Sequence, residues 1–287
     1  MKKASIVLLF VISAFVISCG KYSGFGSNNV FYEGNYVQNR AGELKVLDIP
    51  EIKNLPSEYD FIVVTDSHIG VSRKYAPLSP DNQFISWLSG MEPSSRPSFC
   101  LILGDIADHG YEDEFLQFAD FVAEIEALGV KVFNSVGNHD LYQSGWDLWK
   151  DNCYPHTSFY KFQTSSYSFY SLDTGTGTIG EKQLKLLKAD LEEDPLPKII
   201  FTHYPIYTDI FFFNFDDTTD RNLLMNYCSQ NNVKLYLSGH LHWLEKYEFG
   251  SFDSYILPSY RYKAQWTVVH VNEKNQTYEL SVITAED

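Results

Sequence analysis

Five stretches of the chain share one pattern, a run of apolar residues that ends in Asp, Asn or His. They cover residues 59–68, 98–105, 130–140, 198–205 and 233–242. Nearly continuous apolar runs of this length are typical of strands that are buried on both faces of a sheet. The pattern therefore predicts five buried strands, each with polar side chains at its carboxyl end.

Three of the gaps between these strands have the spacing of helices. Residues 113–129, 180–194 and 220–232 place apolar side chains at intervals of three and four residues. Strands that alternate with helices predict an α/β architecture. In open α/β sheets, ligands bind beyond the carboxyl ends of the strands, which is where the polar residues of this chain fall.

Other segments predict strands that no helix separates. Residues 167–175, 266–272 and 277–284 have this character and favour antiparallel pairing, and residues 43–50 predict a short leading strand. The sequence thus predicts an α/β fold with mixed sheets. With 287 residues, of which 44% are hydrophobic, the chain can bury a large core, and no linker to a second domain is evident.

The amino terminus has the pattern of a targeting segment. Two lysines precede an apolar run over residues 6–17, which is too short to span a bilayer and predicts a signal peptide. The sequence VISC, residues 16–19, resembles the lipobox of bacterial lipoproteins. That resemblance implies a lipoprotein signal peptide over residues 1–18 and a lipid on Cys19. An ordinary signal peptide and an uncleaved anchor remain alternatives.

Residues 19–42 are rich in Gly, Asn, Ser and Tyr and predict a tether, followed by a domain over residues 43–287. We expect a protein of the bacterial cell envelope that lipid holds on the periplasmic or extracellular face. Because Gly20, and not Asp, follows Cys19, the outer membrane stays open as its location.

Net charge limits the partners. The chain carries a formal charge of −15 and a sequence pI of about 4.9, so it lacks the basic surface of a protein that binds long nucleic acid. It also lacks a polybasic segment for anionic lipids, so membrane contact is expected through the lipid on Cys19 alone. We expect a monomer with a small substrate.

Three further cysteines lie within the domain. Cys100 is in an apolar strand and predicts a buried thiol, whereas Cys153 and Cys228 could form a disulfide in an oxidising compartment or remain free. Their spacing excludes a zinc knuckle of the CxxC type.

Histidines gather at the strand ends. One histidine there is commonly structural, but five of the eight in the chain follow predicted strands: His68, His139, His203, His240 and His242. Asp66 and His68 are two residues apart, as are His240 and His242, so each pair can point to the same side of an extended chain. Mixed oxygen and imidazole ligands suit Mn, Fe or Zn, and this set is too large for one tetrahedral ion. It fits two metals that share a carboxylate.

The segments DSH, GD, GNHD, THYP and GHLH, in this order, resemble the motifs of the calcineurin-like metallophosphoesterases. The resemblance implies a four-layer αββα sandwich with two divalent metal ions. It also implies in-line attack on a phosphodiester or phosphomonoester by a hydroxide that bridges the metals. The ligands implied for one metal are Asp66, His68 and His242, those for the other are Asn138, His203 and His240, and Asp105 bridges both.

The same resemblance makes His139 a catalytic residue that protonates the leaving oxygen. Asp140 either orients His139 or caps the loop. In the related purple acid phosphatases a Tyr lies three residues after the bridging Asp, but this chain has Asp108 there, which argues against an Fe(III)–tyrosinate centre.

Nearby side chains could contact substrate. Arg73 and His109 are candidates, although the sequence favours a loop residue in contact with solvent for both, and Asp108 is expected to stabilise a turn. The aromatic segment 207–217 predicts a lid, a stacking wall or a cluster packed on the core.

Two rival functions remain open at this stage. One is a nucleotide pyrophosphatase of the same family, and the other is a non-catalytic metal-binding scaffold on the same fold.

Overall fold

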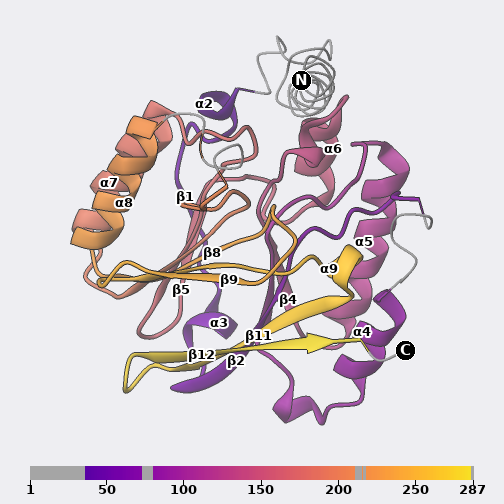
Figure 1. Ribbon diagram of the computed structural model, residues 1–287. Coiled ribbons are helices and arrows are strands. Elements are labelled where there is room, and N and C mark those ends of the chain that lie inside the picture. Colours follow the sequence, from indigo (N-terminus) through magenta and orange to yellow (C-terminus); the bar gives the residue numbers. More distant parts are fainter. Residues whose placement is uncertain (1–35, 73–79, 211–214, 216–217, 286–287) are drawn as a thin grey trace, which may run out of the picture.

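The structure is a computed structural model, and it describes residues 36–72, 80–210, 215 and 218–285 (Figure 1). The predicted signal peptide, Cys19 and Arg73 lie outside the described residues. Within the described ranges, no helix combines the length and the apolar character needed to cross a membrane.

Seven strands form the first sheet. In spatial order they are β1 (Lys45–Val46), β5 (Tyr160–Gln163), β6 (Ser168–Ser171), β7 (Lys198–Phe201), β8 (Val233–Ser238), β10 (Asp253–Ile256) and β9 (Glu245–Glu248). From β6 to β10 neighbouring strands are parallel, and β5 and β9 are antiparallel to their inner neighbours.

Five strands form the second sheet. Their order is β12 (Thr277–Thr284), β11 (Gln265–Asn272), β2 (Glu58–Val64), β3 (Phe99–Ile102) and β4 (Lys131–Asn134). Strands β2, β3 and β4 are parallel, and β11 runs antiparallel to both β2 and β12.

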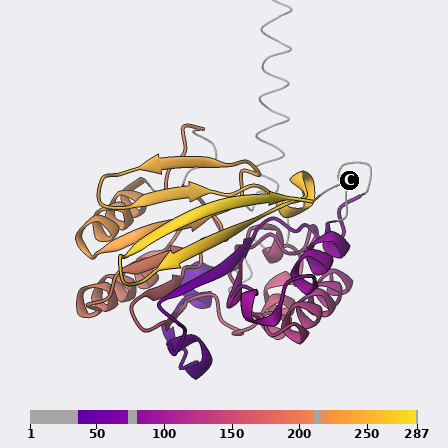
Figure 2. The same cartoon turned by 90° about the horizontal axis from the view of Figure 1, so that it is seen from below.

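Alternation of side chains along the strands builds the layers. On β2, Phe61 and Val63 pack into the core between the two sheets, while Ile62 and Val64 face helices. Helices α4 (Asp81–Ser89), α5 (Glu112–Ala127) and α6 (Gly145–Asn152) cover the five-stranded sheet, and α7 (Glu181–Glu193) and α8 (Thr218–Gln230) cover the seven-stranded sheet (Figures 1 and 2). The predicted αββα sandwich is therefore confirmed.

The long predicted elements are present. The five predicted strands are β2, β3, β4, β7 and β8, and the three predicted helices are α5, α7 and α8. The C-terminal strands β11 and β12 pair antiparallel as expected, whereas β6 is antiparallel to β5 but parallel to β7. Short elements were not predicted: α3 (Pro50–Lys53), α4, α6, α9 (Tyr260–Lys263), β5, β9, β10, and the 3₁₀ turns Pro93–Ser95 and His139–Leu141.

The amino-terminal boundary of the domain differs from the expectation. Helix α2 (Val37–Arg40) packs on the fold, and the Arg40 guanidinium forms two hydrogen bonds of 2.8 Å with the carboxylate of Asp173. Both side chains are fully buried, and Trp146 lies under the guanidinium at 5.7 Å. Residues 37–41 therefore belong to the folded domain, which corrects the expected start at residue 43, because a buried ion pair holds them.

The three cysteines among the described residues, Cys100, Cys153 and Cys228, are free and buried. Cys100 is a buried thiol as predicted. Cys153 packs with the helices beside the five-stranded sheet, and Cys228 packs with those beside the seven-stranded sheet. The two thiols lie on opposite sides of the sandwich, so the alternative of a disulfide between them is excluded.

Candidate functional site

The carboxyl ends of the parallel strands in the two sheets meet at one edge of the sandwich. The backbone N–H of Asp66, after β2, donates to the carbonyl oxygen of Gly104, after β3, at 3.1 Å. His203 follows β7 in the other sheet, and its ring Nδ1 lies 2.8 Å from the carbonyl oxygen of Leu103. The His240 backbone N–H, after β8, reaches the Asp66 carboxylate at 3.1 Å. These bonds join the loops of both sheets into one site.

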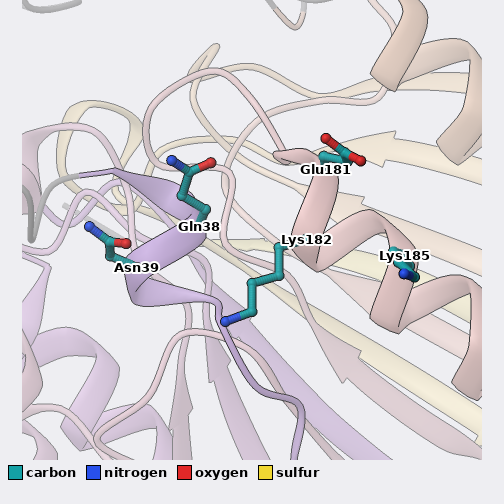
Figure 3. Close-up of a pocket in the computed structure, with 5 residues that line it drawn as sticks. All are labelled: Gln38, Asn39, Glu181, Lys182 and Lys185. Carbon is teal, nitrogen blue, oxygen red and sulfur yellow. The ribbon is translucent and has the colours of Figure 1, made fainter.

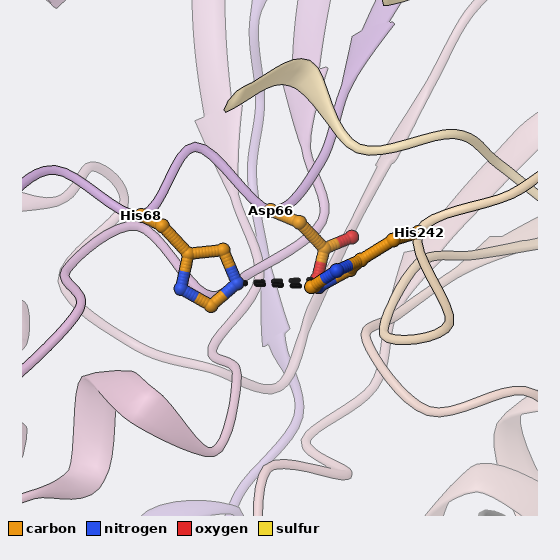
Figure 4. A group of neighbouring side chains, drawn as sticks. All are labelled: Asp66, His68 and His242. Carbon is orange, nitrogen blue, oxygen red and sulfur yellow. Dashed lines mark hydrogen bonds and ion pairs between the residues drawn. The ribbon is translucent and has the colours of Figure 1, made fainter. Parts of the chain in front are cut away.

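Asp66, His68 and His242 form the first ligand group (Figure 4). The Nε2 atoms of His68 and His242 are 3.3 Å apart, and the His242 Nε2 is 3.3 Å from Asp66 Oδ1. Two imidazole nitrogens and a carboxylate oxygen thus converge on one point, which is the arrangement of a cation site.

Asp105, His203 and His240 form the second group, with Asn138 beside it. The His203 Nε2 lies 3.3 Å from Asp105 Oδ2, 3.1 Å from Asn138 Oδ1 and 3.2 Å from the His240 Nδ1. The same oxygen of Asp105 is 3.7 Å from the His68 Nε2 of the first group. Asp105 therefore lies between the two groups. The structure brings together all seven residues that the sequence predicted as ligands.

The ligands have an unusual backbone. Asp66, His68, Asp105, His240 and His242 all have positive φ values, between 40° and 71°. Such angles are unfavourable for residues other than glycine and cluster at functional sites, where the surrounding fold holds them. Five of the predicted ligands therefore occupy backbone conformations that the surrounding fold must hold in place.

Two glycines of the motifs allow close approach between the loops. A Cβ on Gly137 would collide with the backbone N of Asp105, and a Cβ on Gly239 would collide with the Thr65 hydroxyl. Glycine is required where backbones pass this closely. The glycine that precedes Asn138 and the one that precedes His240 therefore let those ligands reach the site.

The ionisation of the site suits metal ions. Burial opposes ionisation of Asp66, but His242 beside it lowers the pKa of that carboxyl to about 2. Burial likewise opposes charge on Asp105, yet His203 holds its pKa well below the usual range. Burial disfavours charge on His203 as well, but Asp105 outweighs it and raises the His203 pKa to about 9. The two buried carboxylates are thus ionised, and their negative charge favours cations in the site.

The ionisation state of His240 also suits a metal ligand. Burial, and then the charge of His203, lower the pKa of His240 to about 3, so its ring is neutral and offers a lone pair. Neutral imidazoles and ionised carboxylates are the forms that bind cations. The donors present therefore fit divalent ions.

His139 lies at the rim of both groups. Its Nδ1 is 2.7 Å from the carbonyl oxygen of Asp108, and its Nε2 is 4.0 Å from Asp105 Oδ2. Its side chain is about one quarter exposed, at 23%. The backbone N–H of His139 donates to Asp105 Oδ1 at 2.8 Å. The ring is thus oriented by a backbone carbonyl, with Nε2 directed toward the site.

Asp140 does not orient the His139 ring. Its carboxylate accepts hydrogen bonds from the backbone N–H groups of Ile106, Ala107 and Gly137 at 2.8–3.0 Å. Burial and the charge of Asp105 raise the pKa of Asp140 to about 7. The loop-capping alternative is therefore correct, because the carboxylate is turned toward the backbone of two motif loops.

Asp108 has a role that the sequence interpretation missed. Its Oδ1 lies 3.0 Å from the His68 Nδ1, the ring nitrogen that points away from the first ligand group. A carboxylate in this position fixes the tautomer and orientation of a metal-binding imidazole. The available signal was its position three residues after Asp105, within the same loop.

His109 and the aromatic segment 207–217 were the less specific candidates for contact with substrate. The His109 Nδ1 is 2.8 Å from Glu114 Oε1, its Nε2 is 3.4 Å from Asp108 Oδ2, and its ring stacks on Tyr111. His109 is thus a half-exposed loop residue beside the site. Of the aromatic segment, residues 211–214 lie outside the described residues, and Phe215 is buried in the core under α7 and α8.

The sequence interpretation also missed three tyrosines: Tyr204 lies inside the THYP motif but was given no role there, and Tyr142 and Tyr262 lie outside the five motifs. Tyr204 stacks on His240 with ring centroids 4.0 Å apart, and Tyr142 packs on His139 at 4.7 Å. Tyr262 of α9 stacks on His242 at 4.9 Å and meets the edge of His68 at 5.2 Å. Nothing near Tyr262 in the sequence indicates this placement.

A second hollow, of about 410 Å³, lies between α2 and α7 (Figure 3). It is lined by Gln38, Asn39, Glu181, Lys182 and Lys185. None of the predicted site residues lines it, and it has none of the imidazole groups that characterise the strand-end site.

Comparison with known proteins agrees with this geometry. A family model described as calcineurin-like phosphoesterase matches residues 59–244. A curated protein of Fibrobacter succinogenes, named a probable cyclic nucleotide phosphodiesterase, is 24% identical over 174 residues, which are 59% of this chain and 61% of that protein. The chain thus spans about three-fifths of the length of this curated relative.

Solved structures share the fold. A dimetal phosphatase from Danio rerio is 15% identical, with a TM-score of 0.54 over 79% of this chain and 99% of that one. GAP50 of Plasmodium, described as the anchor in the inner membrane complex, is 15% identical, with a TM-score of 0.56 over 80% of this chain and 90% of that one. At these identities the likeness concerns the fold alone.

Proposed function

The chain belongs to the calcineurin-like phosphoesterase family and is a hydrolase, and from this premise we propose that it cleaves phosphoester bonds with two divalent cations. The observation that carries the proposal is the convergence of the two ligand groups, with Asp105 between them. Asp66, His68 and His242 would hold one ion, Asn138, His203 and His240 the other, and Asp105 both. The ligand types suit Mn, Fe or Zn.

Two bound cations would supply positive charge for the phosphoryl oxygens and would lower the pKa of a water molecule, so that hydroxide is available as the nucleophile near neutral pH. The chain itself contributes orientation. Asp108 holds the His68 ring and the Leu103 carbonyl holds the His203 ring, so both imidazoles keep the Nε2 atom toward the site.

His139 is the proposed acid. With Nδ1 bound to the Asp108 carbonyl, its Nε2 lies on the side of the ligand groups, 4.0 Å from Asp105 Oδ2, where it would stabilise charge on the phosphoryl group and pass a proton to the leaving oxygen. Its partial exposure suits a group that must meet a substrate from solvent.

Three candidate functions remain: cleavage of phosphodiesters, cleavage of phosphomonoesters, and a scaffold without catalysis. The curated relative from Fibrobacter favours a phosphodiester, whereas the Danio dimetal phosphatase bears the name of a phosphatase. The description of GAP50 as an anchor favours a non-catalytic scaffold. The intact ligand set together with His139 supports catalysis over a scaffold, and the acidic chain supports a small substrate over long nucleic acid.

The test uses the purified protein after chelation and reloading with Mn²⁺. Rates on bis-p-nitrophenyl phosphate and p-nitrophenyl phosphate are compared, with the stripped protein as the control. We expect metal-dependent cleavage, and the ratio of the rates assigns diesterase or monoesterase activity. Two bound ions per chain without cleavage of either ester, or of a nucleotide pyrophosphate panel, would instead support the scaffold.

We also propose that the protein is attached to the bacterial cell envelope through lipid on Cys19, with the domain on the periplasmic or extracellular face. Lys2, Lys3, the apolar run and VISC support this. Labelling with a palmitate analogue should mark the wild-type protein and not Cys19→Ala, with Cys100→Ser as the control. A label that persists in Cys19→Ala would contradict the anchor.

A further inference from the structure

Helix α9 and the Ser259 residue that caps it are hydrogen-bonded to the backbone of the loop that carries Asp66. The Ser259 hydroxyl donates to the carbonyl oxygen of Asp66 at 3.0 Å and accepts from the backbone N–H of Tyr262 at 3.1 Å. The backbone N–H of Tyr260 donates to the carbonyl oxygen of Thr65 at 2.8 Å, and the Arg261 Nε donates to that of Ser67 at 2.8 Å. Consecutive carbonyls of the loop that carries Asp66 are thus bound to this helix, so its side chains have a fixed position at the site.

Tyr262 is the residue of α9 that contacts the predicted ligands. Its ring stacks on His242 with an interplanar angle of 19° and meets His68 at 64°. Both histidines belong to the first ligand group. The side chain is only partly buried. The ring therefore forms part of the wall of the site and remains accessible to a substrate.

The hydroxyl of Tyr262 has no hydrogen-bond partner among the residues that the structure describes. A phenol in this position is a neutral donor next to the predicted cations. The other two tyrosines differ, because the Tyr142 hydroxyl lies 3.5 Å from the Asn138 amide nitrogen, and Tyr204 packs on the second ligand group.

We propose that Tyr262 contacts the substrate of this site and donates its hydroxyl hydrogen bond to a phosphoryl oxygen. The ligand chemistry is a tetrahedral oxyanion, as a phosphate ester or as free phosphate. The inference rests on the proposed phosphoesterase function and adds to it a residue outside the five sequence motifs. It also assigns the C-terminal part of the chain a direct part in binding.

The experiment compares wild type, Tyr262→Phe and the control Tyr227→Phe, which alters a tyrosine of the outer helix α8. Each full-length protein is reloaded with Mn²⁺, and three quantities are measured: bound metal, the Kd of inorganic phosphate by calorimetry, and kcat/KM on both nitrophenyl esters. We expect Tyr262→Phe to keep its metal and to lose about 10- to 100-fold in phosphate affinity and in kcat/KM, the range for one hydrogen bond to a charged group. The control should match wild type.

The outcomes separate the two proposals. If wild type hydrolyses either ester and Tyr262→Phe equals it in phosphate affinity and in kcat/KM, the role of Tyr262 is overturned and the phosphoesterase stands. If Tyr262→Phe loses metal, the tyrosine supports the ligands and does not contact substrate. If loaded wild type neither binds phosphate nor hydrolyses an ester, the proposed function fails and the inference fails with it.

Discussion

The His139 ring is bound through Nδ1 to the Asp108 carbonyl, it meets the His68 ring edge-on at 4.6 Å, and the hydrogen bond to Asp105 comes from the His139 backbone N–H. We predict that His139→Ala retains both cations and lowers kcat by roughly 10²–10⁴, the usual contribution of a general acid. Metal analysis and steady-state rates on one chromogenic ester measure this. His270→Ala, which alters a surface histidine paired with Asp60, is the matched control. Loss of metal from His139→Ala would reassign it as a ligand.

Asp108 acts on the first ion through His68. Asp108→Asn should weaken the binding of one cation by roughly 10- to 100-fold, as is usual when the partner of a metal-bound imidazole is altered. Isothermal titration of the stripped protein with Mn²⁺ resolves the two sites. Asp147→Asn, an exposed aspartate of α6, should bind as wild type does. Equal affinities in Asp108→Asn and wild type would refute the contact seen at 3.0 Å.

Sequence reasoning identified the side chains that the structure brings together at the strand ends, but not the residues that support them, for a physical reason. A ligand such as His68 is recognisable because it ends an apolar strand within a spaced motif. What holds it in place depends on where loops meet: Asp108 reaches a ring 40 positions away in the chain, and Asp140 turns toward the backbone of its own and a neighbouring loop. Such contacts follow from the tertiary fold, which local periodicity does not specify.

Helix α2 has only four residues, so its position on the domain depends mainly on the buried ion pair between Arg40 and Asp173. Arg40→Ala would leave the Asp173 carboxylate buried and deprived of its cation, so we predict a loss of about 3–5 kcal/mol in the free energy of unfolding. Urea denaturation measures it. Lys53→Ala removes the exposed pair with Asp48 and should cost at most about 1 kcal/mol. Equal stabilities of the two variants would show that α2 is dispensable.

The elements that could be predicted were those with enough residues to show a period. Helix α5 has 16 residues and a clear apolar face, and β2 has a continuous apolar run. Helix α9 has only four residues, and its position follows from hydrogen bonds to the β2 loop, so no pattern in the sequence could predict it. The same is true of α2, which was assigned to the tether on composition.

The whole domain should respond to its metal ions, because ligands from both sheets bind them together. Free Mn²⁺ at 100 times the Kd of a site stabilises the folded state by about 2.7 kcal/mol, so two such sites contribute about 5.4 kcal/mol, which corresponds to a rise in Tm of roughly 11–22 °C for a domain of this size. We predict that EDTA lowers Tm by this amount. Differential scanning calorimetry measures it, and Asp105→Asn is the control, with little response to EDTA. A Tm that chelation leaves unchanged would contradict a site shared between the sheets.

Each ligand group spans both sheets: Asp66 and His68 follow β2, whereas His242 follows β8, nearly 180 residues later. A ribosome must therefore synthesise the chain through His242 before the first group exists, and the two sheets must pack before its members meet. Under the proposed function, ion binding would consequently be a late event in biogenesis. A truncated or partly folded chain would not bring the ligands together. The amount of tightly bound metal per chain would therefore report the fraction of correctly folded molecules in a preparation.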